Sequence, residues 1–375
     1  MRASSIILFL LLASLVSSGQ IRTVNNAERS KILTAYGKVV WKATPIQISI
    51  GKGIGLVASQ SVNETNAESL RLHFNVIAKP KDATWAIRVL DAGNNAIWSY
   101  SPFGNEAKQF WSGEVVGPTA KVEVYSTEEN SPLQITVDRV ATSMPPVIPQ
   151  AITVPDNREP IGTQPSAIRE LGKSVARLRF IGDDGFEYVC SGFLVSPDLL
   201  MTNQHCPQSE QEWRSTLVDF DFDSEGMQPM TIAFKTFELS NAELDIAVFR
   251  LSTKPSNRQP LIIDPNSVLS ENKALFIIQH PAGEPKQISL IDCRVSGASI
   301  PGVTSQLTDF GHLCDTLGGS SGSPTFDLAS KKIIGLHHFG FAEDAVEKVN
   351  QSVSIKSIAE FIKTKRPDIW AEMRK

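Results

Sequence analysis

Short runs in which apolar and polar residues alternate fill the first part of the chain, and turn residues separate them. A period of two is the repeat of a half-buried β-strand. Such strands at this spacing predict an antiparallel β-sandwich. The runs are WAIRVLD (85–91), AIWSY (96–100), AKVEVYS (120–126) and LQITVDRVA (133–141).

The later part of the chain shows the same β texture in runs such as SVARLRF, CSGFLVS, DIAVFRL and KIIGLHHF. Only SIKSIAEFIKTKR (354–366) has helical spacing, with Ile355, Ile358, Phe361 and Ile362 on one face. Short strands with one closing helix favour β-barrels or sandwiches over a parallel βαβ sheet. The whole chain is therefore predicted to be all-β.

A proline-rich stretch, MPPVIPQAITVPDNREP (144–160), separates the two parts. Proline disfavours regular structure, so this stretch is predicted to be an extended interdomain linker. The expected division is a β-sandwich at 20–143, the linker at 144–160 and a second domain at 161–375.

The first residues have the pattern of a cleaved secretory signal. One Arg is followed by an apolar run from Ile6 to Leu15, interrupted only by Ser14, and by small residues before Gln20. The run is short for a bilayer span, which needs roughly 20 apolar residues, and no other stretch approaches that length. We expect residues 1–19 to be a signal peptide and the protein to be secreted, outside the cell or into a periplasm, without membrane insertion.

Charge and cysteine content exclude some classes of function for this chain. The formal net charge is −4 and there is no run of Lys or Arg, which argues against a nucleic-acid or anionic-membrane surface. Four cysteines in an exported chain indicate two disulfides, and the lack of a CxxC pair makes structural zinc the weaker interpretation. They are Cys190, Cys206, Cys293 and Cys314.

Three stretches of the second domain carry the candidate chemistry. CSGFLVSPDLLMTNQHC (190–206) contains His205, ELDIAVFRL (243–251) contains Asp245 among apolar residues, and CDTLGGSSGSP (314–324) contains three serines between glycines. A disulfide from Cys190 to Cys206 would stabilise the first stretch by roughly 3 kcal/mol and hold the histidine backbone.

Together these residue types make chemical sense as a catalytic set. A serine needs an adjacent base, a histidine can take and return the proton, and a buried aspartate orients the histidine. Glycines beside the serine can turn backbone N–H groups toward a developing oxyanion. The order His, Asp, Ser is that of chymotrypsin-type barrels.

TNQHC, LDIAVFRL and GSSGSP resemble the trypsin/chymotrypsin-like serine endopeptidases, and more closely the bacterial branch with glutamyl and lysyl endopeptidases. The similarity covers roughly residues 160–375. It implies a chymotrypsin-like double β-barrel, protein or peptide substrates, and neither cofactor nor metal. It further implies that Ser321 is the nucleophile, with His205 as base, Asp245 as its orienting partner, and the amides of Gly319 and Ser321 as the oxyanion hole.

Two departures from trypsin concern activation. The residue before the nucleophile is the uncharged Ser320, where trypsin-like zymogens keep an aspartate, and no Ile-Val-Gly-Gly start follows the linker. We therefore do not expect activation by insertion of a new N-terminus.

Two residues compete for the role of setting substrate preference. Asp315 lies where trypsin keeps the carboxylate that pairs with Lys or Arg. His337 falls where glutamyl endopeptidases keep a histidine that helps to bind a substrate carboxylate. Both cannot dominate one pocket, and the Cys293–Cys314 bridge next to Asp315 would affect its wall. The comparison slightly favours basic residues.

Other interpretations stay open at the same places. Gly318-Gly319-Ser320-Ser321-Gly322 also fits an esterase elbow with Ser320 as nucleophile, although that motif needs the order Ser, Asp, His on an α/β sheet. The alternative functions are an esterase on the same barrel and an inactive barrel that acts as an exported binding or adhesion protein.

His280 is interpreted as structural. DFDFDSEG (219–226) is interpreted as a strand with its acids facing solvent rather than a calcium loop. The sequence leaves the oligomeric state undecided.

Overall fold

The structure is a computed structural model that describes residues 33–78, 84–101, 108–147, 150–151, 155–304, 306–340 and 349–374. It is mostly β, with a closed six-stranded barrel and a half-barrel, which confirms the predicted all-β class and double barrel. The predicted signal peptide lies outside the described residues. Within them, no helix is both long and apolar enough to cross a bilayer.

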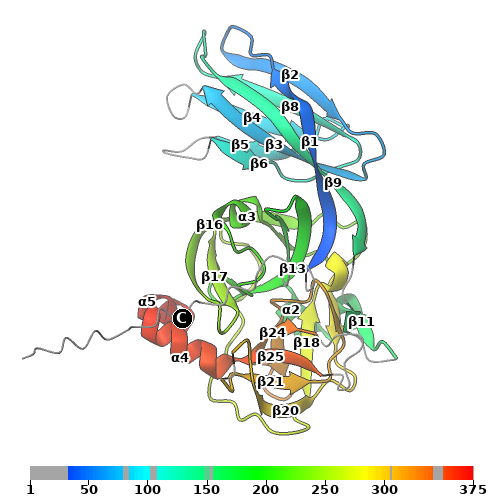
Figure 1. Ribbon diagram of the computed structural model, residues 1–375, viewed down its shortest axis with the longest axis vertical. Helices are drawn as coiled ribbons and strands as arrows, with labels where there is room; N and C mark the ends of the chain where they lie inside the picture. The colour runs from blue at the N-terminus through cyan, green and yellow to red at the C-terminus, as the bar shows by residue number, and fades with distance from the viewer. Residues whose placement is uncertain are drawn as a thin grey trace, which may run out of the picture.

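Two antiparallel sheets form the sandwich at the top of Figure 1. Their apolar inner faces enclose one core, to which all four predicted runs contribute. Strand β4 shows why, because Trp85, Ile87 and Val89 point inward and alternate with more exposed residues. One sheet consists of β1 (Thr34–Ile48), β9 (Gln134–Val147), β3 (Ser69–Ala78), β6 (Gln109–Trp111) and β7 (Val115–Val116). The other consists of β2 (Gly55–Asn63), β8 (Thr119–Ser126), β4 (Trp85–Leu90) and β5 (Ala96–Tyr100).

Six antiparallel strands close the first barrel, in the order β12-β15-β16-β17-β14-β13 with β13 returning to β12. Their bounds are β12 (Val175–Ile181), β13 (Phe186–Leu194), β14 (Leu199–Thr202), β15 (Leu217–Phe220), β16 (Met230–Asn241) and β17 (Ile246–Leu251). Nearly every residue of β12, β13 and β14 is buried, since one face packs in the barrel and the other against its neighbours.

The second half-barrel is a sheet in the order β11-β19-β18-β23-β24-β25-β21-β20. Its strands are β11 (Arg158–Pro160), β18 (Leu275–Gln279), β19 (Gln287–Ser289), β20 (Val295–Ile300), β21 (Asp309–His312), β23 (Pro324–Asp327), β24 (Ile333–Phe339) and β25 (Asn350–Ser354). The single turns η1 (Ile161–Thr163) and η2 (Pro281–Gly283) are 3-10 helices.

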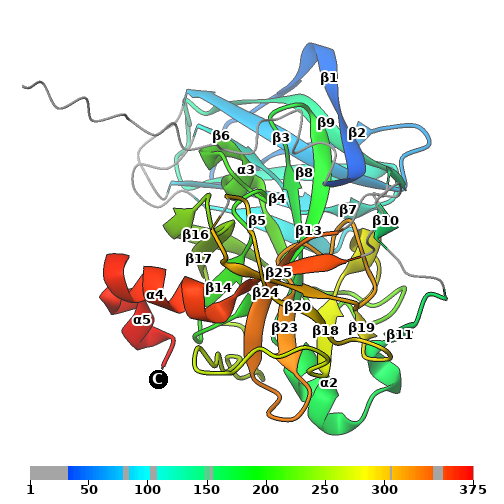
Figure 2. The same ribbon diagram turned by 60° about the horizontal axis from the view of Figure 1, so that its bottom comes forward.

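The predicted closing helix is present as α4 (Ile355–Lys365), and Ile355, Ile358 and Ile362 on its inner face are buried as expected. It lies with α5 (Pro367–Glu372) on one side of the half-barrel (Figure 2). Sequence patterning missed α5 and two other short helices, α2 (Ser166–Gly172) and α3 (Glu210–Ser215). Helix α3 begins with a capping box in which Ser209 and Glu212 each accept from the other's backbone N–H.

The proline-rich segment is more regular than its composition indicates. β9 extends to Val147, β10 (Gln150–Ala151) pairs with β22 (Thr316–Leu317), and β11 pairs with β19. Such short extended pieces tolerate prolines, because a proline keeps its carbonyl acceptor and loses only the N–H donor. The described parts of the segment are therefore paired with other strands, β9 with β1, β10 with β22 and β11 with β19.

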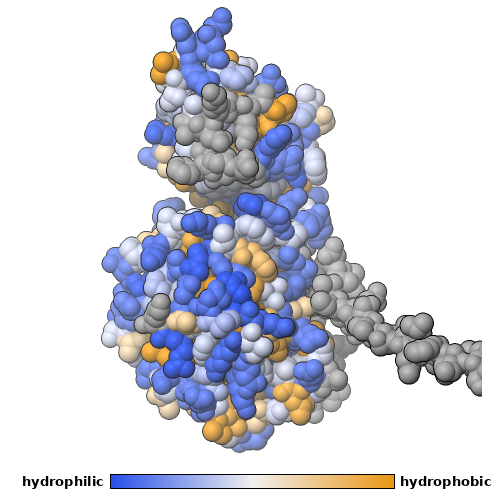
Figure 3. All heavy atoms as spheres, turned by 90° about the vertical axis from the view of Figure 1, so that its left-hand side faces the viewer, coloured by the Kyte–Doolittle hydropathy of each residue, from blue (hydrophilic) through white to orange (hydrophobic). Residues whose placement is uncertain are grey.

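The sandwich and the first barrel share a strand pairing. The first residues of β1 pair with β13, with Thr34 opposite Val189, before β1 continues along β9. Figure 1 shows β1 running down from the sandwich to β13. On the side of the molecule drawn in Figure 3, polar residues predominate and apolar residues form small separate groups.

The interpretation of 219–226 as a strand with solvent-facing acids is wrong for its first acid. β15 ends at Phe220, and Asp219 is completely buried, where its Oδ2 accepts from both Arg177 and Arg179. Burial alone would raise the pKa of this carboxyl, but the two guanidinium groups lower it below its ordinary value. The charge pairs explain the placement, which alternation of residue types cannot reveal.

Candidate active site

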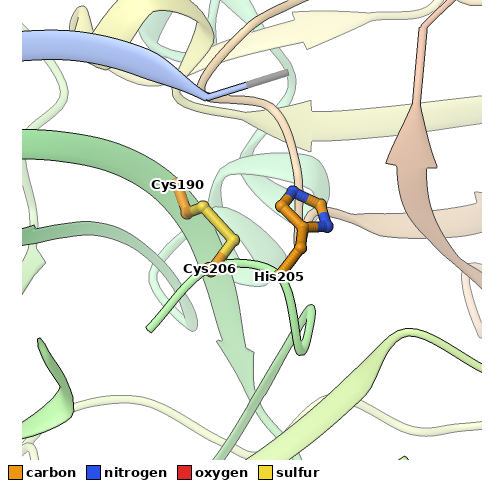
Figure 4. Close-up of side chains that lie close together, drawn as sticks. All are labelled: Cys190, His205 and Cys206. Carbon is orange, nitrogen blue, oxygen red and sulfur yellow. A yellow bond between two sulfur atoms is a disulfide. The ribbon is translucent and has the colours of Figure 1, made fainter. Parts of the chain in front are cut away.

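His205 lies in the loop after β14 and is held from three sides. The Thr202 hydroxyl donates to the Ser191 carbonyl at 2.8 Å, and the Asn203 amide donates to the Asp245 carbonyl at 2.9 Å. Cys206 forms the predicted disulfide with Cys190 beside the imidazole (Figure 4). Because these sulfurs are bonded to each other, they are not thiolate ligands, although they lie near the histidine nitrogens.

Asp245 immediately precedes β17 and receives two hydrogen bonds from His205. Its Oδ1 accepts from the His205 backbone N–H at 2.9 Å, and its Oδ2 lies 2.7 Å from the ring Nδ1. Asp245 has a φ of 45°, in the left-handed region that a short polar side chain tolerates better than most. Burial alone would raise the pKa of this carboxyl, but the contacts with His205 and, to a smaller extent, His338 lower it.

Ser321 lies in the tight loop between β22 and β23, which requires glycine at two positions. Gly319 and Gly322 have φ of 97° and 88°. A Cβ at Gly322 would overlap the Ser191 carbonyl and the Thr202 hydroxyl, so the loop is pressed against the segment that leads to His205. The Ser191 N–H donates to the Ser321 carbonyl at 2.7 Å, which holds the loop in place.

The loop's backbone amides fall into two groups. Those of Ser320, Gly322 and Ser323 donate to the carbonyls of Leu317, His337 and Ser320. Within the part of the chain that the structure describes, neither a carbonyl nor a side chain accepts from the amides of Gly319 and Ser321. These two N–H groups are the ones that the resemblance assigns to an oxyanion hole.

His338, which sequence reasoning missed, contacts both Ser321 and Asp245. The His338 carbonyl accepts from the Ser321 hydroxyl at 3.4 Å, and its ring Nδ1 lies 3.3 Å from Asp245 Oδ2. Its Nε2 lies 2.7 Å from Oδ2 of Asp309, the first residue of β21. The adjacent histidines in GLHHFG were a signal for His338, whereas nothing in the sequence around Asp309 distinguished it.

The charge states of the buried histidines differ. Burial alone would lower the pKa of His338, but its hydrogen bonds to Asp245 and Asp309 raise it to about 9. Burial, followed by the neighbouring His338, lowers the pKa of His312 to about 3. Burial, followed by the neighbouring His312 and His338, lowers the pKa of His337 well below 6.5. His338 is therefore the cation of this cluster at neutral pH.

The two candidate specificity residues lie on different elements, His337 on β24 and Asp315 in the segment between β21 and β22. The His337 ring on β24 is buried, with its Nδ1 3.2 Å from Nε2 of His312. Asp315, next to the Cys293–Cys314 disulfide, is also buried, and its Oδ2 accepts from the Asn157 backbone N–H at 3.0 Å. The predicted linker therefore touches the carboxyl group that is the candidate for binding basic side chains.

His280, interpreted as structural, is completely buried. Its backbone N–H donates to the Ser191 hydroxyl and its Nδ1 lies 3.0 Å from the Glu284 carbonyl. Burial, followed by the nearby Lys286, lowers its pKa well below 6.5. The ring is thus a neutral part of the core.

Comparison with known proteins adds a family match for part of the chain. Residues 190–336 match the family model described as a trypsin-like peptidase domain, which supports a peptidase. A curated relative is secreted RxLR effector protein 73 of Plasmopara viticola, 26% identical over 175 residues, which are 41% of this chain. The chain spans 42% of that protein's length. The glutamyl and lysyl endopeptidase branch stays a prediction.

Several solved structures show partial likeness to this chain. The active form of the Rv3671c protease from M. tuberculosis is 20% identical, with a TM-score of 0.42, over 59% of this chain and 90% of that one. Deg5 is 19% identical, with a TM-score of 0.40, over 51% and 88%. The serine endoprotease from Yersinia pestis is 15% identical, with a TM-score of 0.40, over 53% and 64%.

Proposed function

We propose that this protein is a secreted serine endopeptidase that hydrolyses peptide bonds with Ser321, His205 and Asp245. The observation that carries the proposal is the pair of hydrogen bonds by which Asp245 holds both the backbone and the ring of His205. With Nδ1 engaged, Nε2 is the nitrogen that acts as base. The proposed peptidase unit is 161–375, joined through 144–160 to the sandwich at 20–143.

The chemistry follows from these roles. Ser321 Oγ attacks the peptide carbonyl while His205 takes its proton, and the carbonyl oxygen gains negative charge. The amides of Gly319 and Ser321 donate to that oxyanion. His205 then gives the proton to the leaving amine, which forms an acyl-enzyme, and water activated by the same histidine hydrolyses the ester.

We propose a preference for Lys or Arg before the cleaved bond, through Asp315. The lowered pKa of His337 leaves its ring uncharged at neutral pH, so it offers a substrate carboxylate a hydrogen bond but no opposite charge. Asp315 provides a carboxyl group that pairs directly with a cation. The competing assignment, Glu bound by His337, predicts the opposite selectivity.

Export is part of the proposal. Two disulfides join all four cysteines, as is usual in oxidising compartments. The apolar run from Ile6 to Leu15 has the length of a signal sequence rather than of a membrane span.

The experiment compares the secreted protein with four single variants on a mixed peptide pool, with every cleavage identified by mass spectrometry. Ser321→Ala should remove all cuts, while Ser323→Ala, a buried serine in the same loop, should retain them. Ser320→Ala tests the esterase-elbow interpretation, because only that interpretation makes Ser320 the essential nucleophile. Cuts should follow Lys or Arg, and Asp315→Asn should remove that preference.

A second readout does not depend on finding the right substrate. A fluorophosphonate probe should label the protein once, at Ser321, and the labelled peptide identifies the serine. Absence of both labelling and serine-dependent cuts would contradict the peptidase and favour the exported binding protein. Cuts only after Glu, lost in His337→Gln, would transfer the specificity role to His337.

A further inference from the structure

We propose that His338, held as an imidazolium between Asp245 and Asp309, is a positioning residue. It sets the orientation of Asp245 and the net charge of the groups around it, and so the pH dependence of catalysis by His205. The inference rests on the proposed peptidase function. It assigns roles to two residues outside the Ser321, His205 and Asp245 set.

The charge follows from the geometry of the ring. Nδ1 faces Asp245 Oδ2 at 3.3 Å and Nε2 faces Asp309 Oδ2 at 2.7 Å, so both nitrogens point at carboxylate oxygens. A neutral imidazole has one donor and one acceptor nitrogen. In a neutral ring, one lone pair would therefore face a carboxylate with no proton between them, in a completely buried site. Only the imidazolium donates to both.

The groups around the ring leave the charge on His338. Asp245 faces it from the loop before β17, Asp309 and His312 come from β21, His337 precedes it on β24, and His205 contacts the same carboxylate. The pKa values of His312 and His337 are lowered, so these rings are neutral at pH 7. With His205 neutral, the cluster holds two carboxylates and one imidazolium.

The same residue also touches the nucleophile's loop. The His338 carbonyl accepts from Ser321 Oγ, and the His337 carbonyl accepts from the Gly322 N–H. Anchoring the ring between Asp245, before β17, and Asp309, on β21, therefore fixes the backbone beside Ser321. The role is one of positioning, because the ring itself contacts Asp245 rather than Ser321.

Replacing His338 and replacing Asp309 should shift the pH dependence of kcat/KM in opposite directions. His338→Gln removes a positive charge beside Asp245, which favours the protonated form of His205 and moves the acid limb of kcat/KM to higher pH. Asp309→Asn removes a negative charge from the cluster and moves the limb to lower pH. Both shifts should be about one pH unit in size, the order that a neighbouring charge produces. The double variant restores the net charge and should return the limb toward that of the unmodified protein.

The first experiment measures kcat/KM from pH 5 to pH 10 for the full protein and these three variants, with thermal unfolding to verify that each folds. His73→Gln is the matched control, because His73 is another buried histidine paired with an aspartate, but in the sandwich. Its profile should not move. A residue with only a structural role would change the rate or stability and leave the limb in place, so an unmoved limb in folded His338→Gln and Asp309→Asn would overturn the proposal.

The second experiment does not require activity. Histidine ring signals are followed by NMR in the Ser321→Ala protein, with His338→Gln added for assignment. The His338 ring should stay an imidazolium through pH 8, and a neutral ring at pH 7 would refute the inference. An imidazolium in a protein with no peptidase activity would instead reject the proposed function and leave the charge assignment standing.

Discussion

Arg71 in the sandwich and Glu187 in the first barrel form a buried ion pair across the joint between the two units. Arg71 Nη1 lies 2.7 Å from Glu187 Oε1, and the side chains are 2% and 3% exposed. The same guanidinium donates from Nε to the Ser112 carbonyl of the sandwich and from Nη2 to the Ser215 carbonyl at the end of α3. The two units are thus joined by charge as well as by the pairing of β1 with β13.

Replacing Arg71 by Met should therefore destabilise the whole protein by about 3–5 kcal/mol, because Glu187 stays buried without a partner. Urea unfolding followed by tryptophan fluorescence measures this loss. Adding Glu187→Gln should recover part of it. The exposed pair of Arg214 and Glu210 is the control, and its removal should change stability by about 0.5 kcal/mol or less. A loss below about 1 kcal/mol for Arg71→Met would contradict this account of the joint.

Asp245→Asn should lower kcat by about 10⁴-fold, because the amide no longer selects the His205 ring with a proton on Nδ1. The KM should change little, since Asp245 lies behind the histidine and contacts no substrate. Steady-state kinetics on the best peptide from the cleavage screen separates the two parameters. A loss confined to KM would show that Asp245 acts on binding instead.

The buried histidines predict a maximum of stability near pH 6.5. The pKa of His338 is raised from 6.5 to about 9, so the folded state holds its proton more tightly. That contribution of about 3 kcal/mol is complete below pH 6.5 and is lost as the pH rises through 9. The pKa values of His73, His280, His312 and His337 are lowered, so stability should also fall below pH 6.5.

Urea unfolding across pH 4 to pH 10 tests this profile. His338→Gln should flatten the alkaline side and leave the acid side unchanged. An alkaline slope that persists in this variant would have to come from another group and would count against the charged state of His338.

The two disulfides should differ in kinetics more than in stability. They span 16 and 21 residues, so each should contribute roughly 3 kcal/mol in the chain-entropy model. Cys190→Ala/Cys206→Ala should lower kcat, because Cys206 adjoins His205. Cys293→Ala/Cys314→Ala should raise KM, because Cys314 adjoins Asp315. Equal kinetic losses in the two double variants would show that both act only through global stability.

Sequence patterning predicted the strands with alternating apolar residues well. The runs 85–91, 96–100 and 120–126 correspond closely to β4, β5 and β8, because each buries one face against the sandwich core. β10 and β11 could not be predicted in this way, since their partners rather than their own composition determine them. The start of α3 was missed although the sequence carries a signal for it, because Ser209 and Glu212 have the spacing of a capping box.

The residues of the candidate site were likewise predictable from the sequence only in part. Residue chemistry, the order of the motifs and the family resemblance paired His205 with Asp245, and the structure has them in contact. His338 and Asp309 are 29 residues apart and lie on strands that β25 separates, so only the order of strands in the sheet brings them together. The buried Asp219 was misjudged for a similar reason, because its arginine partners on β12 are distant in sequence.

The shared pairing of β1 with β13 also bears on how the chain acquires its fold. The last strand of the sandwich, β9, ends at Val147 and β13 begins at Phe186, so the sandwich is synthesised before its partner strand exists. At typical synthesis rates this interval is on the order of a few seconds. During it, the beginning of β1 is an unpaired strand edge, which is the kind of surface that invites aggregation. Maturation of this protein therefore includes an early period of vulnerability that ends only when the first barrel closes.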